Sequence, residues 1–135
     1  MGRIINPDNV GSLRNRVSKA VVLALNEYSE KSYPRGEARD MLAFVILSLE
    51  AISNTIDQSV LAWEKRGYWV KADRFRLEWL WAKQLAESLR KALLQDDWAS
   101  AEKIVYQIRQ KLIDVQVSPR HRMGKPWVGA WQKLR

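Results

Sequence analysis

The sequence has no cysteine, one histidine, six glycines and four prolines among its 135 residues. Without cysteine there is no disulfide, no thiolate metal ligand and no thiol nucleophile, and we expect a cytoplasmic protein. A zinc site or a serine–histidine pair would have to use His121. The sequence also lacks the Glu-x-x-His pairs of di-metal bundles and any glycine-rich phosphate loop. We therefore predict no metal, no cofactor and no enzymatic activity.

Long apolar runs are also missing. The longest, Met41–Leu47, is far shorter than the roughly 20 residues that a membrane-spanning helix needs. The first ten residues, Met1–Val10, have no apolar core of a secretion signal. We expect no membrane association.

Positive charge is what the sequence has in excess. Its 23 Lys and Arg outnumber 15 Asp and Glu, which gives a net charge of +8 and an isoelectric point near 10. Such a bias indicates polyanionic partners, namely RNA, DNA or an anionic membrane surface. The alternative is that the charge only keeps the protein soluble.

Four segments have apolar residues at every third or fourth position, which predicts helices. They cover Ser12–Ser32, Glu37–Lys65, Tyr68–Leu94 and a last segment from Trp98 to about Val117. Short connections between long amphipathic helices favour antiparallel neighbours. We therefore predict one all-α domain, an antiparallel up-down-up-down four-helix bundle over residues 1–117.

Apolar stripes in the second and third helices predict the core. The second has a heptad-like seam of Ala38, Leu42, Val45, Leu49, Ile52, Ile56, Val60 and Trp63, and the third a stripe of Val70, Leu77, Leu80, Trp81, Leu85, Leu89 and Leu93. Gly67 is the expected stop of the second helix and Asp97 the expected N-cap of the fourth.

Residues 118–135 differ in composition from the rest of the chain. They contain no acidic residue, and their helix breakers Pro119, Gly124, Pro126 and Gly129 are mixed with basic residues and two tryptophans. We predict a basic, extended C-terminal tail. His121 in this tail is expected to be solvated or to contact phosphate.

The basic residues of two regions are candidates for nucleic-acid binding, because Lys and Arg neutralise phosphates. They are Arg66, Lys71, Arg74, Arg76 and Lys83 around the third helix, and Arg120, Arg122, Lys125, Lys133 and Arg135 in the tail. The alternative for each is an ordinary solvated face with local ion pairs.

Seven tryptophans are more than a core of this size requires. Trp79 and Trp81 widen the apolar face of the third helix, which predicts an oligomer or partner interface there. Trp127 and Trp131 either offer stacking faces for bases or fold back as anchors onto the bundle or a neighbouring subunit.

From Tyr33 to about Arg120 the sequence resembles a known family. The matching features are Tyr33-Pro34-Arg35, the block Ala38-Arg39-Asp40-Met41-Leu42, the start Lys71-Ala72-Asp73 of the third helix, and the run Leu77–Ala86. They resemble the accessory variability determinant family of diversity-generating retroelements, which is related to proteins encoded by intervening sequences in bacterial 23S rRNA genes. The tail from Met123 onward has no counterpart in this resemblance.

The resemblance implies a basic four-helix bundle that forms a homopentamer. It also implies binding to a reverse transcriptase and its template RNA in support of mutagenic cDNA synthesis. An alternative is the small α-helical, nucleic-acid-binding subunit of a CRISPR effector complex, which has a similar size and charge.

Overall fold

The computed structural model describes residues 7–135, and within them helices are the only regular secondary structure. The helices are α1 (Pro7–Glu30), α2 (Arg35–Lys65), α3 (Trp69–Leu94), α4 (Trp98–Lys111) and α5 (Ala130–Leu134). The predicted all-α class and the four long helices are confirmed. α1 begins five residues before the expected Ser12, at Pro7, whose fixed φ suits the first turn of a helix.

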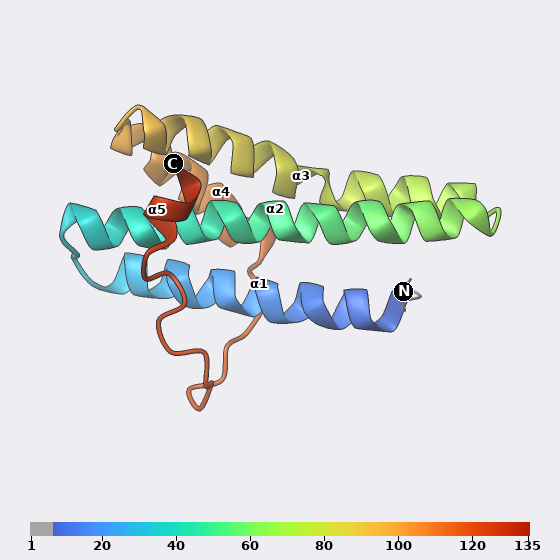
Figure 1. Cartoon of the computed structure of the whole chain (residues 1–135), viewed down its shortest axis with the longest axis horizontal. Helices are drawn as coiled ribbons and strands as arrows, with labels where there is room; N and C mark the ends of the chain where they lie inside the picture. The colour runs from blue at the N-terminus through green and yellow to red at the C-terminus, as the bar shows by residue number, and fades with distance from the viewer. Residues whose placement is uncertain (1–6) are drawn as a thin grey trace.

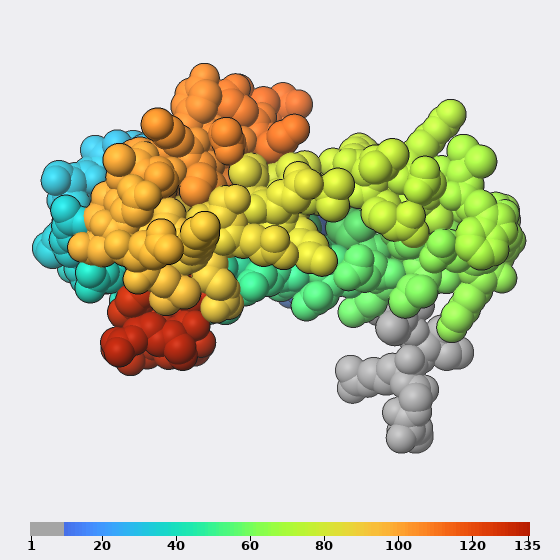
Figure 2. Space-filling view, turned by 90° about the horizontal axis from the view of Figure 1, so that it is seen from above, coloured from blue at the N-terminus to red at the C-terminus, as the bar shows by residue number. Residues whose placement is uncertain are grey.

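α2 is the central element of the bundle. α1 lies along one side of it and α3 along the other, and the chain reverses direction at each of the two turns (Figure 1). α4 packs on α3 and lies on one side of this three-helix layer, whereas α5 packs on α2 and lies on the opposite side (Figure 2). Residues 112–135, which we call the C-terminal segment, therefore cross from one side of the molecule to the other.

The predicted seam of α2 forms the core. All of its aliphatic positions are buried, and Trp63 at the end of the seam is half-buried. Further residues between the seam positions, including Met41, Ala43 and Ile46, are also buried. A helix flanked on both sides by others is covered around most of its circumference, so α2 buries more than one stripe.

The predicted stripe of α3 is only partly correct. Leu89 and Leu93 are buried, but Val70 and Leu77 are 68% and 63% exposed, and Leu80 is exposed as well. The buried positions of α3 are mostly alanines, namely Ala72, Ala82, Ala86 and Ala92, together with the two leucines. Alanine lets two helix backbones approach closely, so α3 packs mainly through its small side chains, whereas Val70, Leu77 and Leu80 lie on its exposed side.

The length of α4 explains why the outer face of α3 stays uncovered. α4 ends at Lys111 and not at the expected Val117, so it has 14 residues against 26 in α3. At 1.5 Å per residue, these helices are roughly 21 and 39 Å long. Because α4 starts beside the C-terminal end of α3, it does not reach Val70 or Leu77 near the other end.

Residues 118–135 are not a free arm throughout. The chain from Leu112 to Gly129 passes around α1 and leads into α5, which lies against α2 (Figure 1). Trp127 is 5% exposed, and Ala130 and Leu134 are also buried. The sequence left two roles open for Trp127 and gave none to Ala130 and Leu134; in the structure the apolar surface of all three is covered by packing onto the bundle.

Arg14 of α1 joins the three helices of the layer. Its Nε donates to Thr55 Oγ1 at 3.2 Å and its Nη2 to Ser59 Oγ at 3.1 Å. Its guanidinium also lies 4.8 Å from the ring centre of Phe75 on α3. Burial lowers the pKa of Arg14 from its usual value, which shows that this cation is partly withdrawn from water and belongs to the packing.

Candidate nucleic-acid interface

The turn between α2 and α3 is fixed by backbone hydrogen bonds. Gly67 N–H donates to Glu64 C=O at 3.0 Å, and Tyr68 N–H donates to Trp63 C=O at 2.9 Å. This pair of bonds is the Schellman arrangement that closes a helix, and it requires a left-handed residue at its centre. Gly67 has φ of 82°, which glycine adopts without steric cost. The expected stop at Gly67 is confirmed.

Two aromatic residues directly after this glycine lie at the end of the hairpin. Tyr68 is 54% and Trp69 63% exposed. Arg66, Lys71 and Arg74 flank them, are exposed, and have no ion-pair partner among residues 7–135. We name these five residues the hairpin tip. It combines free cations, which attract phosphates, with open ring faces, which stack on bases.

Arg76 differs from the other basic residues of this region. Its guanidinium pairs with Asp73 at 3.1 Å and with Glu64 at 3.4 Å. Its charge is therefore offset in part within the chain, which favours the alternative of a solvated face with local ion pairs, and nucleic-acid binding by Arg76 stays a prediction. The same contacts favour the hairpin tip, because Arg76 offsets part of the negative charge of Glu64 and Asp73, the carboxylates nearest to the tip in sequence.

Packing beneath the tip holds Lys71 in place. Lys71 Nζ lies 4.6 Å from the ring centre of Trp63, and Trp63 meets the ring of Phe75 edge-on at 4.8 Å between centroids. A cation over an indole face is favourable when partly shielded from water. The ammonium group is thus positioned by the aromatic pair while it remains exposed.

Lys83 lies apart from the tip, in the second half of α3. It lines a depression between α2 and α3 that also holds Glu50, Asp57 and Glu87. Three carboxylates near one ammonium reduce the attraction for phosphate. The structure therefore does not bring Lys83 together with the cations of the tip.

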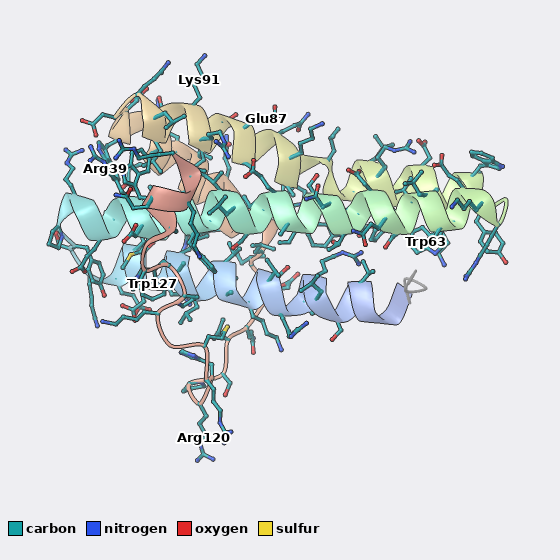
Figure 3. The ribbon with its side chains drawn as sticks, viewed as in Figure 1. Arg39, Trp63, Glu87, Lys91, Arg120 and Trp127 are labelled. Carbon is teal, nitrogen blue, oxygen red and sulfur yellow. The ribbon has the colours of Figure 1, made fainter. Side chains whose placement is uncertain are left out.

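The basic residues of the C-terminal segment form a second region. Arg120, Arg122 and Lys125 are exposed on the loop before α5, and Arg120 projects at the outermost point of that loop, distant from Trp63 at the other end of the bundle (Figure 3). Lys133 and Arg135 are exposed on or next to α5. The ten candidate cations thus do not form one continuous patch.

The four tryptophans expected at an interface have different surroundings. Trp127 is buried within the chain, so it offers no surface to a partner. Trp131 is half-buried, and its ring centre lies 5.4 Å from the guanidinium of Arg39 and 5.8 Å from that of Arg135. Trp127 and Trp131 therefore fold back onto the bundle, which is the second of the two roles that the sequence left open for them. Trp79 and Trp81 are half-buried and stacked on each other with centroids 5.7 Å apart.

Tyr68 and Trp69 were absent from the residues selected by sequence. The available signal was their position directly after Gly67, because the residues that follow a helix-ending glycine lie on the outer end of a hairpin.

The described residues show no constellation for metal-assisted chemistry. Within residues 7–135 no three His, Cys, Asp or Glu side chains come close enough to hold an ion. His121 accepts the backbone N–H of Met123 at its Nδ1, at 3.3 Å, which is a local turn contact. No described helix has the length and apolar character to cross a membrane.

No family model, curated protein or solved structure matches this chain.

Proposed function

We propose that this chain is a non-enzymatic accessory protein that binds nucleic acid and assists a reverse transcriptase in mutagenic cDNA synthesis. The observation that supports nucleic-acid binding is the hairpin tip, where Tyr68 and Trp69 are exposed among three unpaired cations. The link to a reverse transcriptase rests on the resemblance to the accessory variability determinant family. The polymerase then supplies the chemistry and this chain supplies charge and stacking surface in the cytoplasm.

Binding at the tip is expected to be largely independent of sequence. Arg66, Lys71 and Arg74 contact phosphates, which are the same in every nucleotide, and the rings of Tyr68 and Trp69 stack on any base. Open ring faces favour single strands, whose bases are free to stack. We propose that the basic residues of 118–135 make a second contact to the nucleic acid. We also propose that the four long helices follow an up-down-up-down order.

We further propose that the outer face of α3 mediates contact between copies of the chain or with the protein partner. Val70, Leu77 and Leu80 form an exposed apolar stripe on this helix, and Trp79 and Trp81 lie next to it in sequence. Several exposed aliphatic side chains on one side of a helix favour an interface there. The family resemblance implies a pentamer.

The second candidate function is the small α-helical subunit of a CRISPR effector complex. It is also favoured by the exposed cations. The two functions differ in assembly. An accessory protein of the retroelement type forms a closed oligomer alone, whereas the CRISPR subunit assembles only on its guide complex, and light scattering of the purified protein separates them.

The test of nucleic-acid binding is fluorescence anisotropy with labelled single-stranded RNA and DNA. Removing one stacked ring costs about 1–3 kcal/mol of binding energy, so Trp69→Ala and Tyr68→Ala are each expected to weaken binding severalfold or more. Tyr106→Ala is the matched control, since Tyr106 is an exposed tyrosine on α4. Equal affinity of all three variants and the parent protein contradicts binding at the tip.

A further inference from the structure

A groove of about 490 Å³ lies between α1, α2 and the C-terminal segment. Its apolar lining consists of Leu13, Val17 and Ala20 from α1, Phe44, Leu47 and Ala51 from α2, and Met123, Pro126, Val128 and Ala130 from the C-terminal segment. Small-molecule sites have volumes of about 300–1,000 Å³ and mostly apolar linings with a few polar groups. The groove has both properties.

The third wall of the groove is held by contacts at both ends of α5. Asp40 on α2 accepts the backbone N–H groups of Gly129 and Trp131 at 3.1 and 2.9 Å. Arg90 on α3 donates to the carbonyl of Leu134 at 3.5 Å. The loop before α5 lies in front of α1 (Figure 1). The C-terminal segment therefore closes one end of a space that α1 and α2 leave open.

The charged residues at the groove all have the same sign. Arg16 of α1 and Lys133 of α5 line it, and no acidic residue does. Both are exposed, and neither forms an ion pair within residues 7–135. An apolar floor beside two unpaired cations is complementary to a molecule with an apolar body and an anionic head.

We propose that this groove binds a free, single-chain anionic amphiphile of the fatty-acid type. Its carbon chain lies against Val17, Phe44 and Leu47, and its carboxylate lies at Arg16 and Lys133. The lining on α1 and on α2 spans two helical turns each, roughly 10 Å, and ends at the C-terminal segment. That length suits a short carbon chain better than a long partner helix. The site is separate from the hairpin tip.

The experiment is isothermal titration calorimetry of the full chain with dodecanoate below its micelle concentration. Dodecyltrimethylammonium, which has the same chain and the opposite charge, is the comparison ligand. We expect one saturable site for dodecanoate and much weaker binding of the cationic amphiphile. Equal binding of both, or no saturation by dodecanoate, overturns the proposal.

Two variants locate the site. Arg16→Glu is expected to weaken dodecanoate binding about fivefold, which is the upper range for an exposed ion pair. Ala20→Trp fills the groove without a change of charge and is expected to abolish binding. Lys91→Glu is the charge-matched control on the outer side of α3 (Figure 3) and is expected to bind dodecanoate like the parent. Thermal unfolding verifies that each variant folds.

Two further measurements separate this proposal from its alternatives. Ala20→Trp is expected to retain single-stranded RNA binding, so a loss of dodecanoate binding alone is distinct from a failure of the proposed function. Sedimentation with phosphatidylglycerol vesicles tests a membrane surface as the source of the anionic group. Binding to vesicles that Ala20→Trp leaves intact, with no binding of free dodecanoate, overturns the groove as a fatty-acid site.

Discussion

The carboxylate of Asp40 in α2 accepts the backbone N–H of Trp131 at 2.9 Å, although 91 positions separate them in the chain. Its second oxygen accepts the N–H of Gly129 at 3.1 Å. α5 has only five residues, which is too short for a helix to be stable by itself in water. Asp40 therefore caps a helix that another part of the fold has to support, and an anion at a helix N-terminus is also favoured by the helix dipole.

Replacing Asp40 is expected to loosen the C-terminal segment. Asp40→Ala removes a charged acceptor from two backbone donors, and such hydrogen bonds contribute about 1.5–3 kcal/mol. We expect a loss of stability of this size in urea denaturation. Asp57→Ala is the control, because Asp57 is an exposed carboxylate on the same helix. Equal stability of the two variants contradicts the capping role.

Deleting the chain after Ser118 tests the same segment as a whole. The deletion removes Trp127, Ala130 and Leu134 and uncovers the surface of α2 beneath them. We expect helicity by circular dichroism to persist while stability falls by about 3 kcal/mol or more, as for loss of a buried Trp side chain. RNA affinity is expected to fall as well, because Arg120, Arg122 and Lys125 are lost. Unchanged stability refutes the structural role of α5.

Asp96, at the α3–α4 turn, is expected to make the stability of the folded state depend on pH in the acid range. The hydrogen bond from Trp98 Nε1, at 2.6 Å, is the largest cause that lowers the pKa of Asp96 below its ordinary value of 3.8, followed by the bond from Arg39. A carboxyl whose pKa falls on folding stabilises the folded state above its unfolded pKa, and this stabilisation is lost as the pH falls through the lowered value.

Asp96→Asn is therefore expected to be less stable than the parent at neutral pH. The difference is expected to shrink as the pH falls below about 4, because the parent then loses its own carboxylate. Asparagine tolerates the positive φ of 56° at this position. Thermal unfolding over a pH series measures the effect, with Asp114→Asn as an exposed control. A difference that grows toward low pH contradicts the assignment.

The hairpin tip predicts how affinity depends on salt. Three cations that each neutralise a phosphate on a single strand give a slope of log affinity against log salt of about −2. Lys71→Glu is expected to make the slope shallower, whereas Lys91→Glu, with the same change of charge, is expected to have little effect. Anisotropy titrations at several salt concentrations measure both slopes. Identical slopes for the two variants place the phosphate contacts elsewhere.

If the outer face of α3 is an interface between copies of the chain, replacing Leu77 on this face is expected to prevent self-association. Leu77→Lys adds a charge at a position that is 63% exposed, so the stability of the single chain is expected to change by no more than about 0.5 kcal/mol. Self-association, measured by analytical ultracentrifugation, is expected to be lost. Tyr106→Lys changes a similarly exposed residue of α4 and is expected to associate like the parent. An oligomer that tolerates Leu77→Lys does not use this face.

Local signals explain which features the sequence predicted correctly. Gly67 ends α2 because the left-handed turn depends on that residue alone. Asp97 caps α4 by accepting the backbone N–H of Ser100 at 3.1 Å, which involves residues three positions apart. The end of α4 was predicted too late because Val115 and Val117 continue the apolar spacing, although the chain leaves the helix at Lys111 and follows α1.

In the candidate site, too, the sequence indicated the local features but not those that depend on distant residues. The sequence placed Arg66 and Lys71 near one turn, because they are close along the chain and the turn is local. It had no means to separate Arg76, whose charge is offset in part by Glu64 from the preceding helix. It also left two roles open for Trp127, which the packing of α5 on α2 decides.

The sequence by itself determined the long helices and the buried seam of α2 through helical periodicity, and the end of α2 and the start of α4 through Gly67 and Asp97. Only the tertiary structure decided which face of α3 is buried, where the C-terminal segment runs and which cations remain unpaired. The reason is that helix formation depends on residues within one or two turns along the chain, whereas these three features depend on contacts between distant segments. The choice between an alanine face and a leucine face depends on which other helix covers each of them, and that is set by residues far away in the chain.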